Sequence, residues 1–447
     1  MLGAGKLTAR LTDGIGMKQP CYLIGICLGT TIVAACGGAS VGAPPAAQHG
    51  ALLSGAATQL ARPPKEQVLW NFTGGADGGD PIGGVIADAA GNLYGGTIAG
   101  AALDEGTIFE LTPIGRKYAE KTLVTFNGRN GNSSSGALAM DASGMLFGTT
   151  VWGGTYGYGT VFRITMNGGV RERAIWSFGG SLKDGANPDA GVVLDAHGAL
   201  YGTTSVGGAF GGGVAYKLTP SGRTYTEAIM HAFGGDSDGK YSVAPLTLVK
   251  NGVLYGTAGG GGNGCSHGCG IVFKLTPSGT GYSESKVYTF TGGSDGSGPS
   301  SGLTVGSSGA MYGVTDYGGG GGCADGYGCG TVYKLTPSGS GYTERVLWVF
   351  GSGTDGYYPM SNVVIGRAGT LYGTTWQGGS GYGGVVYELL PNGSSYKEKV
   401  LMNFVNGPDG YDPRGNLFLD RDHRLIGTTY AGGSSEFPDG TVFRFTP

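Results

Sequence analysis

The sequence predicts an all-β fold, a seven-bladed β-propeller of four-stranded blades. Three observations predict it: glycine supplies 97 of 447 residues while 40% of the chain is hydrophobic, one unit recurs seven times, and the two ends of the repeats complement each other. The glycines follow no three-residue period, which excludes collagen, and they are interleaved with Tyr, Val, Leu and Phe, which excludes simple disorder. Short strands joined by tight turns, in which glycine adopts positive φ, account for this mixture.

The N-terminal segment carries an export signal. Residues 21–35 form an apolar run that is short for a membrane-spanning helix of about 20 residues and typical of a signal-peptide core. The run ends in V-A-A-C-G, which resembles a bacterial lipobox and implies acylation of Cys36. We predict a lipoprotein signal peptide at residues 1–36, with Met17 as an alternative start. An ordinary signal peptide or a short membrane anchor is the alternative.

Residues 37–64 are rich in Ala, Gly and Pro without periodicity, which predicts a flexible tether. The residue after Cys36 is Gly37 and not an acidic residue, a pattern typical of lipoproteins sent to the outer membrane. We therefore expect an exported monomer at the bacterial outer membrane or cell surface, facing the periplasm or the exterior. Its contact with the membrane is expected through the N-terminal lipid only.

One pattern recurs through residues 65–447: E-x-V-L-x-x-F, G-G-x-D-G-x-x-P, an apolar strand ending near D-x-x-G, L-Y-G-T-T, a glycine-rich loop, and G-T-V-F-K-L-T-P-S-G. Its first phenylalanine marks the register at intervals of 52 to 60 residues, at Phe72, Phe126, Phe178, Phe233, Phe290, Phe350 and Phe404. The third unit, for example, contains candidate strands at residues 172–178, 192–195, 199–204 and 214–219.

The ends of the repeats predict a closed ring. The repeats begin with the strand at residues 66–72 and end with the strand at residues 440–447, so the last unit lacks a fourth strand that the first strand can supply. An open solenoid would instead need polar caps.

The register phenylalanine is expected to pack between blades. Glu227, Ile229, His231 and Phe233 alternate along one fourth strand and are predicted to share one face. A second aromatic recurs in the third strand, and we expect it to be structural as well: Phe109, Phe162, Tyr216, Phe273, Tyr333, Tyr387 and Phe443.

The motifs L-Y-G-T-T, G-T-V-F-K-L-T-P-S-G and G-G-x-D-G-x-x-P resemble the units of a bacterial tandem-repeat family, the GloVer repeats, over residues 65–447. The resemblance implies a propeller-like fold and an extracytoplasmic location. It implies no activity.

A binding site is expected on the face that carries the D-G-x-x-P segments and the glycine-rich loops, because the turns of the opposite face are short and nearly uniform. Aromatic residues among the glycines of this face are the candidate ligand-binding residues: Trp152, Tyr156, Tyr158, Phe210, Tyr317, Tyr327, Trp376, Tyr382 and Tyr430. Rings between small residues suit a sugar or an extended peptide. The structural alternative is that they fold over the glycine loops and bury backbone.

Two carboxylates recur once per unit. An aspartate precedes glycine at Asp77, Asp184, Asp238, Asp295, Asp355 and Asp409, with Asn130 in the second unit, and this pattern favours turn chemistry over calcium. A glutamate recurs at Glu66, Glu120, Glu172, Glu227, Glu284, Glu344 and Glu398, and cross-strand pairing with Arg163, Lys217, Lys274, Lys334 or Arg444 is the simplest explanation. Glu110 and Glu388 do not fit that pairing.

Four cysteines remain after export, all in equivalent glycine-rich loops: Cys265, Cys269, Cys323 and Cys329. An even number in an exported chain predicts disulfides, most simply the two local pairs, with pairing between neighbouring blades as an alternative. Zinc held by four thiolates, with His267, is a second alternative.

Composition limits the function. A net charge of −3 with 13% charged residues leaves no basic surface for nucleic acid, and no residue cluster indicates a metal or other cofactor. We expect a non-catalytic cell-envelope module that binds glycan or an extracellular protein. A propeller hydrolase or lyase acting on polysaccharide is one alternative, with Asp80, Asp189, His197 and Asp412 as candidate residues, and a structural envelope protein is another.

Overall fold

The computed structural model describes residues 66–447, apart from 235–236, 263–264, 266–267, 321, 324–325, 352, 406 and 435–438. The predicted signal peptide, the tether and Cys36 lie outside the described residues. Among the described residues no helix is long and apolar enough to cross a membrane.

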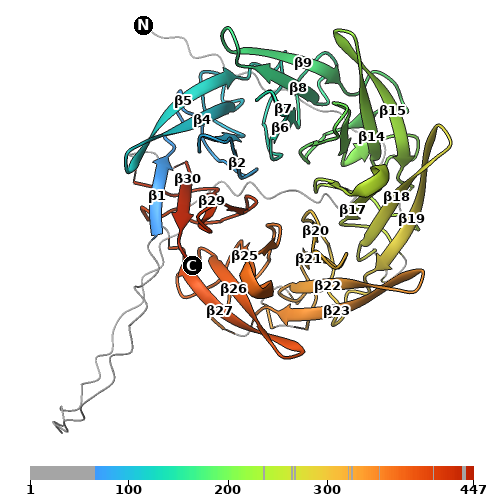
Figure 1. The fold of residues 1–447 in the computed structure, drawn as a ribbon, viewed down its shortest axis with the longest axis vertical. Coiled ribbons are helices and arrows are strands. Elements are labelled where there is room, and N and C mark those ends of the chain that lie inside the picture. Colours follow the sequence, from blue (N-terminus) through green and yellow to red (C-terminus); the bar gives the residue numbers. More distant parts are fainter. Residues whose placement is uncertain are drawn as a thin grey trace, which may run out of the picture. The chain divides into compact units, whose positions relative to one another are not determined.

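Seven four-stranded antiparallel sheets stand around a ring, as predicted (Figure 1). Blade 1 contains β2 (Val85–Ala87), β3 (Leu93–Gly96), β4 (Thr107–Ile114) and β5 (Lys117–Thr125), which pair in that order. Short innermost strands and long outermost strands follow from the sequence, since the third and fourth strands form a hairpin around the T-P-S-G turn.

The other blades repeat this arrangement. Their strands are β6 (Ala139–Met140), β7 (Leu146–Thr150), β8 (Thr160–Thr165) and β9 (Arg171–Ser177) in blade 2; β11 (Val193–Leu194), β12 (Leu200–Thr203), β14 (Val214–Ser221) and β15 (Thr224–Ala232) in blade 3; β16 (Thr247–Leu248), β17 (Leu254–Ala258), β18 (Ile271–Ser278) and β19 (Gly281–Thr289) in blade 4; β20 (Thr304–Val305), β21 (Met311–Thr315), β22 (Thr331–Ser338) and β23 (Gly341–Val349) in blade 5; β24 (Val364–Ile365), β25 (Leu371–Thr375), β26 (Val385–Asn392) and β27 (Ser395–Asn403) in blade 6; and β28 (Phe418–Leu419), β29 (Leu425–Thr429), β30 (Thr441–Phe445) and β1 (Glu66–Asn71) in blade 7. A two-residue pair, β10 (Gly185–Ala186) and β13 (Val206–Gly207), lies above blade 3, and two 3₁₀ turns, η1 (Lys250–Gly252) and η2 (Arg367–Gly369), connect strands.

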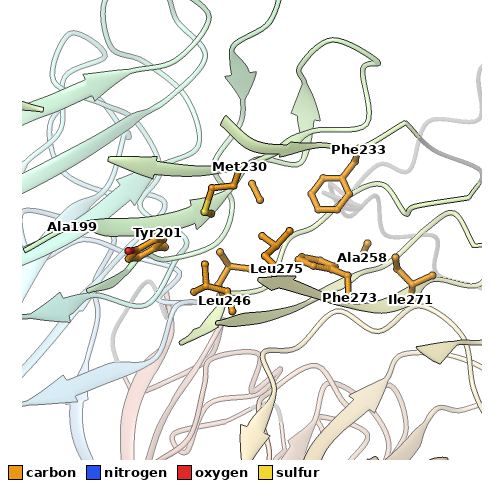
Figure 2. Packing of buried hydrophobic residues seen from close by; sticks show 11 residues of the cluster. Ala199, Tyr201, Met230, Phe233, Leu246, Ala258, Ile271, Phe273 and Leu275 are labelled. Carbon is orange, nitrogen blue, oxygen red and sulfur yellow. The ribbon is translucent and has the colours of Figure 1, made fainter. Parts of the chain in front are cut away.

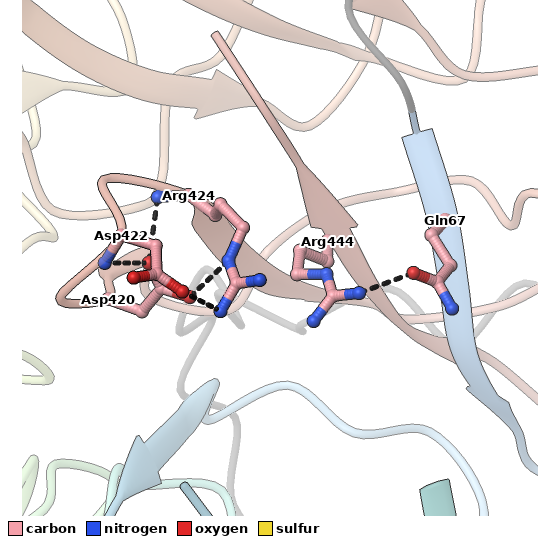
Figure 3. Close-up of polar contacts among 5 residues, drawn as sticks. All are labelled: Gln67, Asp420, Asp422, Arg424 and Arg444. Atoms are coloured by element: carbon pink, nitrogen blue, oxygen red, sulfur yellow. Dashed lines mark hydrogen bonds and ion pairs between the residues drawn. The ribbon is translucent and has the colours of Figure 1, made fainter. Parts of the chain in front are cut away.

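The ring closes as predicted, because β1 completes the sheet that contains the last strand. β1 pairs antiparallel with β30, from Glu66 opposite Phe445 to Asn71 opposite Thr441. The guanidinium of Arg444 on β30 donates a hydrogen bond to Oε1 of Gln67 on β1 (Figure 3). The first and last strands of the described residues are therefore held in one sheet.

The core consists of seven clusters between neighbouring blades. In each cluster the register phenylalanine packs against the third-strand aromatic of the next blade, with ring centroids 5.0 to 5.4 Å apart. Figure 2 shows one cluster, in which Phe233 of blade 3 faces Phe273 of blade 4. Both predicted sets of aromatic residues are thus confirmed as structural.

A β-bulge corrects one prediction about the fourth strand. The pairing of β14 with β15 shifts by one residue between Ala215 and Tyr216, so strict alternation stops there. Met230 is buried, whereas Ile229 is 37% exposed. The expectation that Glu227, Ile229, His231 and Phe233 share one face is therefore wrong, although Phe233 itself is fully buried.

The glycine of L-Y-G-T-T is explained by close packing. A Cβ added to Gly256 on β17 would lie 2.3 Å from Cζ of Phe273, the ring that crosses it from β18. A Cβ added to Gly202 in the same way would lie 2.4 Å from the hydroxyl oxygen of Tyr216. The aromatic core of each blade therefore requires glycine at this position.

Candidate functional site

The D-G-x-x-P connections and the glycine-rich loops lie on one face, as expected. Within each blade the two segments bond to each other through short backbone bridges, such as Ser297 with Tyr317, Tyr357 with Gln377, and Tyr411 with Ala431. We call this surface the loop face.

Buried threonines provide the base for this face. The second threonine of L-Y-G-T-T and the threonine that opens the third strand share a hydrogen bond, 2.9 Å long between Thr315 and Thr331 and 3.0 Å long between Thr429 and Thr441. Thr375 Oγ1 also donates to the carbonyl of Gln377 at 3.0 Å. These hydrogen bonds fix the end of the strand. The residue after each of these threonines therefore starts its loop from a defined position.

Aromatic rings of blades 5 to 7 form a continuous series on the loop face. Tyr317 contacts Tyr327 at 6.3 Å and Tyr358 at 5.5 Å between ring centroids, and Tyr358 contacts Trp376 at 6.0 Å. The guanidinium carbon of Arg414 lies 4.5 Å from the ring centroids of both Trp376 and Tyr430. We call this set of six residues, Tyr317, Tyr327, Tyr358, Trp376, Arg414 and Tyr430, the aromatic arc.

Backbone conformation places part of the arc. The residue before the proline position of D-G-x-x-P has positive φ in all seven units, including Tyr358 and Asp412 at 59° each and Asp80 at 56°. Non-glycine residues avoid this region unless the surrounding structure enforces it. At Tyr358 two backbone hydrogen bonds hold this conformation, from its own N–H to the Cys329 carbonyl and from the Trp376 N–H to the Tyr358 carbonyl, each 2.9 Å long.

Carboxyl groups border the arc. Burial raises the pKa of Asp80 to about 7, and Asp439 adds to the effect, while Tyr430 and Arg414 oppose it. Burial also raises the pKa of Asp412, against the influence of Trp376 and Arg414, and Arg414 Nη2 lies 3.6 Å from Asp412 Oδ2. The pKa of Asp316 is raised to about 7 by burial, and the Ser300 hydroxyl donates a hydrogen bond to it. The flat apolar rings of the arc therefore lie beside carboxyl groups whose pKa values are raised, to about 7 for Asp80 and Asp316.

The structure brings together only some of the predicted ligand-binding residues. Four belong to the arc, namely Tyr317, Tyr327, Trp376 and Tyr430. Trp152, Phe210 and Tyr382 are exposed on loops of blades 2, 3 and 6. The rings of Tyr156 and Tyr158 cover Gly180 and Gly179, which agrees with the structural alternative for these two residues.

Tyr358 and Arg414 were missed by the sequence prediction. Both flank the proline of D-G-x-x-P, where the residue varies between units, and this variation was the available signal. Of the residues considered for catalysis, Asp80 and Asp412 both border the arc, and Asp189 lies in blade 3. His197 is exposed in the turn between β11 and β12 on the opposite face, so its grouping with the other three is wrong.

The ring axis contains a small cavity of about 100 Å³. Each blade contributes the residue that follows the proline position: Ile82, Ser135, Asp189, Val243, Ser300, Met360 and Arg414. Small-molecule sites usually measure about 300–1,000 Å³. The axial cavity is therefore smaller than a typical small-molecule site.

The recurring glutamates face the recurring aspartates across blade junctions, so the predicted pairing with basic residues is wrong. Glu227 of β15 faces Asp184, and similar pairs are Glu66 with Asp409, Glu120 with Asp77, Glu284 with Asp238, Glu344 with Asp295, and Glu398 with Asp355. The basic residues have other contacts, for example Lys217 over the ring of Tyr201 at 5.3 Å. Glu110 accepts a hydrogen bond from Tyr94 and Glu388 pairs with Lys399, which explains those two positions.

The second unit indicates that one member of each pair donates a hydrogen bond to the other. There Asn130 replaces the aspartate, and its Nδ2 donates to Glu172 Oε2 at 3.3 Å. In this pair the amide N–H of Asn130 is the donor. In the other pairs a protonated carboxyl group would be the donor. The aspartates also accept backbone N–H bonds in their turn, as Asp184 Oδ2 does from Gly179 and Gly180, in keeping with the expected turn chemistry.

The junction pairs predict a stability that falls as pH rises. Burial, with the charge of the facing aspartate, raises the pKa of Glu66, Glu344 and Glu398 to about 7 and that of Glu227 to about 8, from an ordinary value of 4.5. Between these values the folded state binds more protons than the unfolded state, so the stabilisation is complete below pH 4.5 and lost as pH passes through 7 to 8. We expect the melting temperature to decrease from pH 5 to pH 8.

Thermal unfolding followed by circular dichroism tests this expectation. The triple variant Glu66→Gln, Glu344→Gln and Glu398→Gln should flatten the profile, because an amide does not titrate. A melting temperature that rises between pH 5 and pH 8 in the unaltered protein contradicts the pairing.

The cysteines form the two local disulfides, Cys265–Cys269 and Cys323–Cys329. Sulfurs bonded in pairs are not available as zinc thiolates, so the zinc alternative and the pairing between blades are both wrong. His267 lies outside the described residues. Each disulfide packs near the segment that follows a register phenylalanine, at Gly292 and Gly351.

Comparison with known proteins finds one sequence family. The profile of the Gloeobacter/Verrucomicrobia repeat matches residues 45–181, 120–326 and 321–447. No curated protein matches the chain.

Several solved structures resemble the chain at low identity. A candidate 6-phosphogluconolactonase of Bacteroides uniformis is 13% identical with a TM-score of 0.45, over 71% of this chain and 82% of that chain. The extracellular domain of a candidate one-component system of B. thetaiotaomicron is 10% identical with a TM-score of 0.49, over 84% of this chain and 40% of that chain. A candidate glucose dehydrogenase of Thermus thermophilus is 13% identical with a TM-score of 0.39, over 86% of this chain and all of that chain. These likenesses are distant and carry no functional information.

Proposed function

The chain belongs to the Gloeobacter/Verrucomicrobia repeat family, and we propose that it is an exported, non-catalytic propeller that binds glycan through its aromatic arc. The observation that carries this proposal is the unbroken contact of rings from Tyr327 to Trp376 and on to the Arg414 guanidinium between Trp376 and Tyr430.

The chemistry of the arc suits a sugar chain. Aromatic faces stack on the apolar faces of sugar rings, and neighbouring carboxyl and guanidinium groups bind hydroxyls. The arc extends over three blades, so successive sugar units find successive rings. A protein ligand is the alternative occupant, and a screen of glycans distinguishes the two.

Retention on a polysaccharide panel, with analysis of released products, tests the proposal. We expect the double variant Trp376→Ala and Tyr430→Ala to lose roughly thirtyfold in affinity, about 2 kcal/mol, as central aromatic contacts do. Phe210→Ala is the matched control, since Phe210 is 69% exposed on a loop of blade 3 and outside the arc. Equal loss in both variants, or no glycan retained by the unaltered protein, contradicts the proposal.

Hydrolysis is the second candidate, favoured by one observation. Asp80, with a pKa of about 7, and Asp412, next to Arg414, both border the arc, and glycosidases use an acid and a base of this kind. Shortened products in the same assay, abolished by Asp80→Asn, would replace the binding proposal with this one.

We also propose that Cys36 carries the lipid that holds the propeller at the cell envelope. The two disulfides support export, since such bonds persist in oxidising compartments. We expect Cys36→Ser to move the protein from the membrane fraction to the soluble fraction and to abolish incorporation of labelled palmitate. Unchanged membrane association of that variant contradicts lipid anchoring.

A further inference from the structure

A cleft lies between blades 2 and 3. It has a volume of about 550 Å³ and is lined by Thr155, Tyr156, Trp176, Ser181, Asp184 and Glu227. Its walls come from the β7–β8 loop, from β9, from the connection to blade 3 and from β15. This volume lies within the range of small-ligand sites, about 300–1,000 Å³.

One polar group of this cleft, the indole N–H of Trp176, lacks the partner that its counterparts have. At two equivalent junctions the indole Nε1 donates to the recurring aspartate, Trp70 to Asp77 at 3.4 Å and Trp348 to Asp355 at 3.3 Å. At the blade 2 junction Asp184 Oδ2 is taken up by backbone N–H groups, and Trp176 Nε1 has no hydrogen-bond partner among the described residues.

Two carboxyl groups accompany this donor. Asp184, which is only 8% exposed, shares a hydrogen bond with Glu227 across the junction. Leaving a buried donor unpaired costs about 1–3 kcal/mol, so a ligand that accepts from the Trp176 indole gains this amount back on binding.

The ring of Tyr156 completes the cleft. It is 53% exposed and lies against the backbone of Gly180, with Cε2 3.1 Å from where a Cβ would stand. One ligand class offers hydrogen-bond donors to two carboxyl groups, an acceptor to an indole N–H and an apolar face to an aromatic ring. This class is a sugar ring with vicinal hydroxyls.

We propose that the cleft lined by Tyr156, Trp176, Asp184 and Glu227 binds a single neutral sugar residue, independently of the aromatic arc. The site lies between blades 2 and 3, whereas the arc occupies blades 5 to 7. A branched or terminal sugar can therefore bind here whether or not a glycan chain binds the arc.

Titration of the full-length protein, labelled with ¹⁵N-tryptophan, tests the proposal with the methyl glycosides of glucose, galactose and mannose. At least one glycoside should shift the indole resonance of Trp176. Trp176→Phe and Asp184→Asn should each weaken its binding about tenfold, the effect of losing one hydrogen bond to a charged or buried group. Both changes have precedents in the chain, because the second unit carries an apolar residue, Val124, and Asn130 at the equivalent positions.

Matched variants test whether the effect is specific to this site. Trp348→Phe, at a junction where the indole is already bonded, should leave the affinity measured at the Trp176 resonance unchanged. Phe210→Ala, outside both sites, should do the same. The proposal is overturned if no glycoside moves the Trp176 resonance, if Trp348→Phe weakens binding as much as Trp176→Phe does, or if only glucosamine binds, which would indicate an amine site.

Discussion

A chain that begins at residue 73 should lose its cooperative thermal transition, because removing β1 opens the ring. The deletion removes β1 with Leu69, which is 6% exposed, and the adjoining Phe72, which is 0% exposed, and β1 pairs along its length with β30. Loss of two such side chains costs about 5–10 kcal/mol. This is comparable with the whole stability of a domain, about 5–15 kcal/mol. Differential scanning calorimetry measures the effect.

The control for this deletion is a chain that begins at residue 65, which keeps β1 and should melt like the full protein. A synthetic peptide of residues 65–73, added in excess, should restore part of the transition by pairing with β30. An unchanged midpoint in the chain that begins at residue 73 is incompatible with closure by β1.

Gly256→Val should cost about 3 kcal/mol, the upper end of the range for an overfilled core. The added Cβ would stand 2.3 Å from Cζ of Phe273, and that ring is fixed by its contact with Phe233 at 5.1 Å between centroids. The free energy of unfolding in urea measures the loss.

Gly281→Val is the matched control. Gly281 also lies in blade 4, on β19, and a Cβ there would meet no atom within 4 Å, so a change within about 0.5 kcal/mol is expected. Combining Gly256→Val with Phe273→Leu should recover part of the loss, because the ring that clashes is gone. Equal losses at Gly256 and Gly281 would mean that the motif glycine is not required by packing.

Periodicity accounts for what could be predicted about the fold. The register phenylalanines and the matching ends of the repeats depend only on residues that recur, so the blade number, the closing strand and the aromatic core were accessible from sequence. The bulge at Ile229 and Met230 could not be predicted from sequence. It inserts one residue into a strand whose apolar residues follow a pattern of simple alternation.

Contacts between units explain the remaining errors. Glu227 and Asp184 meet across a blade junction, and within one unit the glutamate has a basic neighbour that suggests a different pairing. Prediction of the pair requires the geometry of the ring. Asn130 beside Glu172 was the available signal, because an amide substitutes there for the acid.

The arc was predictable only in part for the same reason. Tyr317, Trp376 and Tyr430 stand out as aromatic residues among glycines. Arg414 and Tyr358 stand out only when the seven units are aligned and the positions around the proline are seen to vary. Residues that recur in every unit form the core of the ring, and residues that vary between units form the aromatic arc on its loop face.

Titration of the ¹⁵N-tryptophan-labelled protein with the best glycan of the polysaccharide panel tests the central claim most directly. Each of the five tryptophans reports on a different place, with Trp376 in the arc and Trp70 and Trp348 bonded to aspartates inside junctions. The account predicts a saturable shift of the Trp376 indole resonance while those of Trp70 and Trp348 stay in place. A glycan that binds and leaves Trp376 unmoved would contradict it.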